Sequence, residues 1–159
     1  SEWLQQQSDK YCPGRIIQLG HLDKSVLSGY YAKADIFVHP NPREPFGIAP
    51  LEAMASGVPT VAPNAGGILS YATNDNAWLV EPTGEAFAGA VREVVADPEL
   101  RARKTELALR TALANTREAS TDNLIATYDR IFDDFQSRKD LFTDSADSKK
   151  FNYVELTKD

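Results

Sequence analysis

Two carboxylates, Glu44 and Glu52, lie eight positions apart in the stretch HPNPREPFGIAPLEAMASGVPTVAPNAGG, one before and one just inside an expected helix. Pro45 has no N–H and favours an extended residue before it, and Gly47 leaves room for a ligand against the bare backbone. The N–H groups of a helix start, together with the helix dipole, favour an anion such as a phosphate. The expected donors are the N–H groups of Phe46, Gly47, Ile48 and Ala49. Carboxylates repel phosphate but accept hydrogen bonds from hydroxyl groups. The pattern therefore suits a ligand with an anionic middle and a polyol at each end, as in a nucleoside diphosphate sugar.

The composition is that of an ordinary globular protein, and it argues against several classes of function. The 159 residues are enough for one domain with a core. A formal net charge of -6 disfavours nucleic-acid binding, which needs a basic face. The single cysteine, Cys12, allows no internal disulfide and suits a reducing compartment. No apolar run approaches the roughly 18 residues of a membrane span, and no signal pattern opens the chain. We expect a cytoplasmic protein with no nucleic-acid partner and no transmembrane segment, with peripheral membrane contact left open.

Short strands that alternate with helices place the two glutamates in an α/β fold. The expected strands are Arg15–His21, Asp35–Pro40, Pro59–Pro63 and Ala77–Pro82. The expected helices are Ser1–Tyr11, Asp23–Ala34, Gly47–Ser56, Thr83–Ala96, Pro98–Thr116 and Thr121–Arg138, with a brief helix between the third and fourth strands. Their expected caps are Thr83, Asp97 and either Thr121 or Ser120 at the starts, and Gly57 at an end. This order predicts a Rossmann-like, doubly wound parallel sheet, whose ligands bind at the carboxyl ends of the strands.

The stretch EPFGIAPLE (Glu44–Glu52), followed by AMASGVPTVAPNAGG, resembles the Glu-x7-Glu signature of retaining glycosyltransferases of the GT-B fold. The most similar family is the group 1, or family-four, set. The flanking stretches LGHLDKSVLSGYYAKADIFVHPN and NAWLVEPTGEAFAGAVREVVADPELR resemble the neighbouring parts of that family, so the resemblance covers about Arg15 to Phe135. It implies that residues 1–138 are part of a C-terminal nucleotide-sugar-binding domain, followed by a polar tail at 139–159.

The resemblance also implies roles for individual residues. Glu44 would be the catalytic residue that accepts hydrogen bonds from the donor sugar, and Glu52 would hold the ribose hydroxyls. The other donor-binding positions would be the backbone N–H groups of Phe46, Gly47 and Ile48, with Gly20 and Leu22 bordering the base.

The reaction implied is transfer of a hexose with retention of configuration, in which a diphosphate oxygen helps to deprotonate the acceptor. The family usually needs no metal and no cofactor. Its carbohydrate or lipid acceptor would bind through an N-terminal domain that is missing here. The first residues, SEWLQQQSDK, include no Met and begin inside an expected helix, so we expect the chain to be a piece of a longer protein that has no transferase activity by itself.

The sequence departs from the family pattern at several points. Asn41 replaces a usual serine, and Ser70 stands where many members have a glutamate. The basic clamp for the pyrophosphate would come from an earlier strand that this sequence lacks. Two other functions therefore stay open: a non-catalytic nucleotide-sugar-binding module, and a sugar-nucleotide epimerase of the same architecture. The glutamate pair with PFG argues against the epimerase, and the absence of G-x-G-x-x-G after a strand argues against a dinucleotide oxidoreductase.

Several other residues have structural interpretations. Tyr30 and Tyr31 are expected to pack on a helix face, and Trp78 is expected in the core. The pair Gly66–Gly67 forms either a simple tight turn or part of the site, and His39 either caps a strand or faces the floor of the site.

The order of the strands raises a further question. In the order 3-2-1-4-5-6 of this fold, Arg15–Leu19 would be the third strand and Asp35–Val38 the fourth, so they are not neighbours. We expect either an empty position beside Asp35–Val38, left by strands that precede this sequence, or direct pairing of the two segments.

Overall fold

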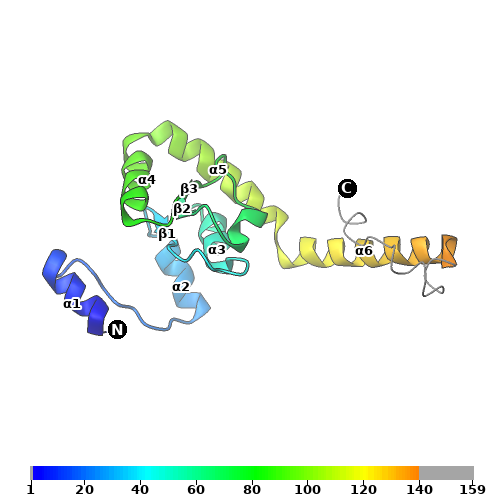
Figure 1. Ribbon diagram of the computed structural model, residues 1–159, viewed down its shortest axis with the longest axis horizontal. Coiled ribbons are helices and arrows are strands. Elements are labelled where there is room, and N and C mark those ends of the chain that lie inside the picture. Colours follow the sequence, from blue (N-terminus) through cyan, green and yellow to red (C-terminus); the bar gives the residue numbers. More distant parts are fainter. Residues whose placement is uncertain (1, 140–159) are drawn as a thin grey trace. The chain divides into compact units, whose positions relative to one another are not determined.

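Three parallel strands form the sheet in this computed structural model, which describes residues 2–139 (Figure 1). They are β1 (Phe37–Val38), β2 (Thr60–Pro63) and β3 (Trp78–Val80), in the order β1-β2-β3. Phe37 pairs with Thr60, and Val61 pairs with Trp78. The α/β class and the parallel sheet are therefore confirmed, and the order agrees with that expected for the last three strands of a doubly wound fold.

The helices match most of the expected segments. They are α1 (Glu2–Tyr11), α2 (Lys24–Tyr31), α3 (Ile48–Ala55), the short 3-10 helix η1 (Gly67–Ser70), α4 (Gly84–Ala96), α5 (Pro98–Ala114) and α6 (Arg117–Ser137). Thr83 Oγ1 accepts a hydrogen bond from Ala86 N at 3.3 Å, and Asp97 Oδ1 accepts one from Leu100 N at 2.9 Å. These contacts confirm both expected caps, each of which satisfies an N–H group that the helix itself leaves without a partner. Gly57 follows the end of α3 with a positive φ, as expected of a glycine after a helix.

The chain divides into two units, Ser1–Ala112 and Leu113–Asp159. In the first unit, Val61 packs with the α4 residues Ala90 and Val94, whereas its neighbour Ala62 packs with Met54 of α3. Successive side chains of a strand point to opposite faces, so α3 and α4 cover opposite faces of the sheet. This arrangement is the doubly wound one expected.

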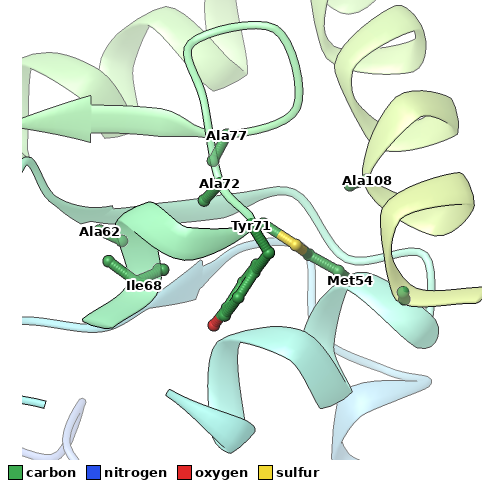
Figure 2. Packing of buried hydrophobic residues seen from close by; sticks show 8 residues of the cluster. Met54, Ala62, Ile68, Tyr71, Ala72, Ala77 and Ala108 are labelled. Atoms are coloured by element: carbon green, nitrogen blue, oxygen red, sulfur yellow. The ribbon is translucent and has the colours of Figure 1, made fainter. Parts of the chain in front are cut away.

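Small side chains dominate the core on the α3 face. Figure 2 shows this cluster, which consists of Met54, Ala62, Ile68, Tyr71, Ala72, Ala77, Ala108 and Ala112. Alanines let the backbones of neighbouring elements approach closely, so small changes in side-chain volume are felt there. Because the same cluster contains Tyr71, it connects the core to the segment that carries the two glutamates.

Trp78 lies in the second cluster, beside α4, and is 3% exposed, which confirms its expected place in the core. The ammonium of Lys104, a residue of α5, lies 4.6 Å from the centroid of the Trp78 ring and donates a hydrogen bond to Ala77 O at 3.0 Å. Burial lowers the pKa of Lys104. The charge is thus buried with a carbonyl and an aromatic face as its partners.

The expected strand Arg15–His21 is wrong. The segment has no regular structure, and Ile17 is 80% exposed. Among the described residues, β1 pairs only with β2, so direct pairing of Arg15–Leu19 with Asp35–Val38 does not occur. An apolar run becomes a buried strand only when a neighbouring strand and a covering layer are present, and residues 2–139 supply neither for this segment. That preceding strands fill the open edge of β1 stays a prediction.

The second unit contains α6, which begins earlier than expected. Its cap is Thr116, whose Oγ1 accepts a hydrogen bond from Ala119 N at 3.2 Å. The expected caps Ser120 and Thr121 are therefore wrong, because both lie inside the helix, where Thr121 Oγ1 donates to Arg117 O. No helix in the described part of the chain is long and apolar enough to span a membrane. The expected polar tail, residues 139–159, lies outside the described residues from 140 onward.

Candidate functional site

The loop between β1 and α3, residues 39–47, is called here the site loop. It leaves the carboxyl end of β1 and leads into the first turn of α3. Glu44 is half-buried, Phe46 is exposed, and Gly47 is buried with φ 92°, a conformation that residues with a Cβ rarely adopt. Ile48, the first residue of α3, is exposed. The structure therefore brings four of the predicted site residues together at the carboxyl end of the sheet.

The start of α3 has no side-chain cap. The N–H groups of Ile48 and Ala49 are therefore available, and Pro50, the third residue of the helix, has none to offer. A helix start with unpaired N–H groups carries partial positive charge, so it can hold an anion although the whole chain is acidic.

Glu44 is oriented by the loop itself. Asn41 Nδ2 donates a hydrogen bond to Glu44 Oε2 at 3.1 Å, and Asn41 Oδ1 accepts one from Arg43 N at 3.1 Å. Asn41 thus joins the turn to the carboxylate, and an amide can do this because it both donates and accepts. The asparagine that departs from the family pattern is therefore part of the site.

The double glycine, Gly66–Gly67, packs its backbone against the site loop. Gly67 N donates to Glu44 O at 2.7 Å. A Cβ atom on Gly67 would lie 1.8 Å from Pro45 O, and one on Gly66 would lie 2.9 Å from Pro42 O. The sequence left open whether Gly66–Gly67 forms a simple tight turn or part of the site. The structure favours the second interpretation, because the backbone of the double glycine packs directly on the backbone of the site loop.

Tyr71, one residue after η1, holds the other side of the site loop. Its hydroxyl donates a hydrogen bond to Gly47 O, and its ring lies 5.2 Å from the Phe46 ring, centroid to centroid. Figure 2 shows the ring leaving the cluster with its hydroxyl directed toward α3. Burial, and to a lesser extent the charge of Glu44, raises the pKa of Tyr71 to about 12. Sequence reasoning missed this residue; the available signal was a tyrosine shortly after the double glycine.

We expect Tyr71 to ionise only at strongly alkaline pH. Its folded pKa of about 12 exceeds the ordinary value of 10.0, so the folded state binds the proton more tightly than the unfolded state. Its contribution to stability is therefore complete below pH 10 and is lost as the pH rises toward 12. The measurement is the ultraviolet absorbance of tyrosinate against pH, with the Tyr71→Phe curve subtracted. A component that titrates together with the exposed tyrosines would contradict this assignment.

Glu52 lies on α3 and faces α2. Tyr31 of α2 approaches Glu52 Oε2 at 3.4 Å and Ala49 O at 3.4 Å with its hydroxyl group. Burial raises the pKa of Tyr31, and the charge and hydrogen bond of Glu52 raise it further. A cavity of about 220 Å³ opens beside them, lined by Lys24, Leu27, Ser28, Tyr31, Glu52, Ala55 and Ser56. Glu52 thus faces a space with apolar and polar walls and one basic residue, Lys24, which sequence reasoning missed.

Gly20 and Leu22 do not join the site loop. They lie in the segment between α1 and α2, where Gly20 is exposed and Leu22 is half-buried. Leu22 precedes Lys24 by two positions, so the segment leads toward the cavity beside Glu52. A role for Gly20 and Leu22 at a base stays a prediction.

His39 follows β1 directly. Its ring stacks on Phe37 with centroids 6.3 Å apart, and within residues 2–139 its buried Nε2 has no hydrogen-bond partner. The described residues contain no group of three or more His, Cys, Asp or Glu side chains suited to a metal ion.

The domain is thus an α/β domain with a parallel sheet, a proline-rich loop at the carboxyl edge of that sheet and a helix start between two glutamates. The family model of group 1 glycosyl transferases matches residues 1–110, and the chain belongs to this family. The fold is that of the C-terminal domain of a GT-B glycosyltransferase.

Individual relatives support this assignment. A GDP-mannose-dependent alpha-(1-6)-phosphatidylinositol dimannoside mannosyltransferase of Mycobacterium tuberculosis is 33% identical over 105 residues, which are 66% of this chain and 27% of that protein. The C-terminal domain of a group 1 family glycosyl transferase from Francisella tularensis matches with a TM-score of 0.64 and 26% identity, over 72% of this chain and 60% of that one. Anabaena HepE, in complex with UDP and glucose, matches with a TM-score of 0.69 and 25% identity, over 79% of this chain and 35% of that one. The chain thus spans about a quarter of the mycobacterial relative and about a third of HepE.

Proposed function

We propose that this chain binds the nucleoside diphosphate sugar donor of a glycosyltransferase. The observation that carries the proposal is the uncapped start of α3 with Glu44 before it and Glu52 within it. The diphosphate binds the N–H groups of the first turn, Glu44 accepts hydrogen bonds from the sugar, and Glu52 accepts them from the ribose. Phe46, Gly47 and Ile48 present the backbone to the sugar and phosphate.

We further infer that the full-length protein is a retaining hexosyltransferase with a carbohydrate or lipid acceptor. The mycobacterial relative is a mannosyltransferase whose name gives GDP-mannose as donor and a phosphatidylinositol dimannoside as acceptor, which supports this proposal. We propose that no metal and no cofactor take part in it, because the helix start and the basic clamp expected from an earlier strand together supply the positive potential that the diphosphate needs.

The isolated chain should bind the donor weakly. The reason is that the helix start and both glutamates are present, whereas the basic clamp expected from an earlier strand is not in this sequence. Calorimetry with UDP-glucose and GDP-mannose, with the free diphosphates as references, measures the affinity and tells the two donors apart. Affinity in the low micromolar range would contradict the importance of the clamp, and no binding of any of the four compounds would contradict the proposed function.

Transfer by the isolated chain is expected to be absent. The chain spans only about a quarter of its mycobacterial relative, and the acceptor is proposed to bind on a part of the protein outside it. Turnover of UDP-glucose and GDP-mannose, followed by release of the free diphosphate, tests this expectation with and without sugar acceptors. Release by the purified 159-residue chain would overturn it. Release by the full-length protein separates a transferase from a binding module.

A further inference from the structure

We propose that two buried tyrosines, Tyr31 and Tyr71, position the two ends of the donor site independently, Tyr71 at the sugar end and Tyr31 at the ribose end. The inference rests on the proposed function, and it assigns to each glutamate a tyrosine that holds the nearby backbone.

The two tyrosines approach the start of α3 from separate elements. Tyr71 comes from the segment after η1 and donates to Gly47 O, and Tyr31 comes from α2 and approaches Ala49 O at 3.4 Å. They are 9% and 8% exposed. Each hydroxyl therefore meets a different carbonyl at the start of α3, Gly47 O for Tyr71 and Ala49 O for Tyr31.

At the sugar end, Tyr71 contacts Phe46 and Gly47, which follow Glu44 and Pro45 along the chain. A Cβ on Gly47 would lie 2.8 Å from the Tyr71 hydroxyl and 3.6 Å from Glu44 Cγ, so the hydroxyl and the glutamate side chain converge on the same glycine. The Tyr71 ring also packs against Phe46. Loss of the hydroxyl therefore frees the Gly47–Ile48 peptide, whose carbonyl it binds, and removes a constraint on the loop that carries Glu44.

At the ribose end, Tyr31 acts on Glu52 directly. Its one proton serves two acceptors, Glu52 Oε2 and Ala49 O, each at 3.4 Å. Both distances are long for an O–H···O hydrogen bond, so the proton is shared and the carboxylate keeps capacity for ligand hydroxyls. Since burial raises the pKa of both tyrosines, both remain donors throughout the neutral range.

The test uses two affinity ratios, measured by NMR titration of this chain. The sugar ratio is the affinity for UDP-glucose divided by the affinity for UDP, and the ribose ratio is the affinity for UDP divided by that for 2′,3′-dideoxy-UDP. If the guanosine compounds bind more tightly, GDP-mannose, GDP and 2′,3′-dideoxy-GDP are used instead. The variants are Tyr71→Phe and Tyr31→Phe, which lose only a hydroxyl. Tyr30→Phe is the matched control, since Tyr30 neighbours Tyr31 and is 45% exposed.

We expect Tyr71→Phe to lower the sugar ratio about three- to tenfold, the effect of one hydrogen bond, with the ribose ratio unchanged. Tyr31→Phe should lower the ribose ratio by a similar factor and leave the sugar ratio unchanged, and Tyr30→Phe should change neither ratio. A tyrosine that serves the fold alone would weaken all ligands equally, so unchanged ratios, or equal losses in both, would overturn the inference. A wild-type chain that binds none of these compounds, or that shows no preference for the sugar or the ribose, contradicts the proposed function instead.

Discussion

Replacement of Glu44 by alanine is expected to lower the affinity for a nucleoside diphosphate sugar about ten- to a hundredfold and to leave the affinity for the free diphosphate unchanged. The reason is that the carboxylate, which Asn41 Nδ2 contacts at 3.1 Å, is proposed to accept charged hydrogen bonds from the sugar alone. Such bonds contribute roughly 1.5–3 kcal/mol each. Calorimetry with both ligands gives the two affinities.

Two further variants control this experiment. Glu44→Gln loses the charge and one acceptor oxygen but keeps the other oxygen, so it should lose less sugar affinity than Glu44→Ala. Glu52→Ala should weaken the diphosphate and the diphosphate sugar by similar factors, because the ribose is common to both. If Glu44→Ala weakens the free diphosphate as much as the diphosphate sugar, the role given to Glu44 is wrong.

Gly67→Ala is expected to destabilise the protein by about 3 kcal/mol or more, a large effect for one added methyl group. The new Cβ would lie 1.8 Å from Pro45 O and 2.7 Å from Phe46 N, and both obstacles are backbone atoms that cannot rotate away. The site loop must then move off the double glycine, which also breaks the hydrogen bond from Gly67 N to Glu44 O. Urea unfolding, followed by circular dichroism, measures the change in the free energy of unfolding.

Gly29→Ala is the matched control for this substitution. Gly29 lies inside α2 with no atom within 4 Å of its added Cβ, so alanine should stabilise the helix by about 0.5–1 kcal/mol. Equal effects of the two substitutions would contradict the close packing of the site loop on Gly67.

The elements around the glutamate pair were predictable because their signals are local. Pro45 and Gly47 mark the start of α3, and Gly57 marks its end, whatever the rest of the chain does. Thr83 and Asp97 cap their helices with contacts to residues three positions further along. The sequence therefore predicts α3, α4 and α5 and the place of the glutamates.

The features that the sequence did not predict all depend on contacts between residues that are distant in the sequence. The apolar segment Arg15–His21 has the composition of a strand, but the neighbour that would make it one is not encoded in its own residues. Tyr30 and Tyr31 were both predicted to pack on a helix face; Tyr31 does so, whereas Tyr30 is 45% exposed, so that prediction is wrong for Tyr30. The contact of Tyr31 with Glu52 depends on how α2 and α3 lie against each other. The partner of Gly67 is the backbone of the site loop, and a glycine carries no side chain that would indicate such a partner.

The buried pair of Lys104 and Trp78 gives this protein an internal optical reporter. Indole emission shifts to longer wavelength when the ring passes from a buried site into water. When the sheet opens, Trp78 becomes exposed and also loses its contact with the Lys104 ammonium, which lies 4.6 Å from the centroid of its ring. The other tryptophan, Trp3, is 66% exposed and emits like a solvated indole in either state. In a Trp3→Phe background, fluorescence therefore follows the opening of the sheet alone. It allows folding of the core to be monitored separately from the ligand binding proposed at the opposite end of the strands.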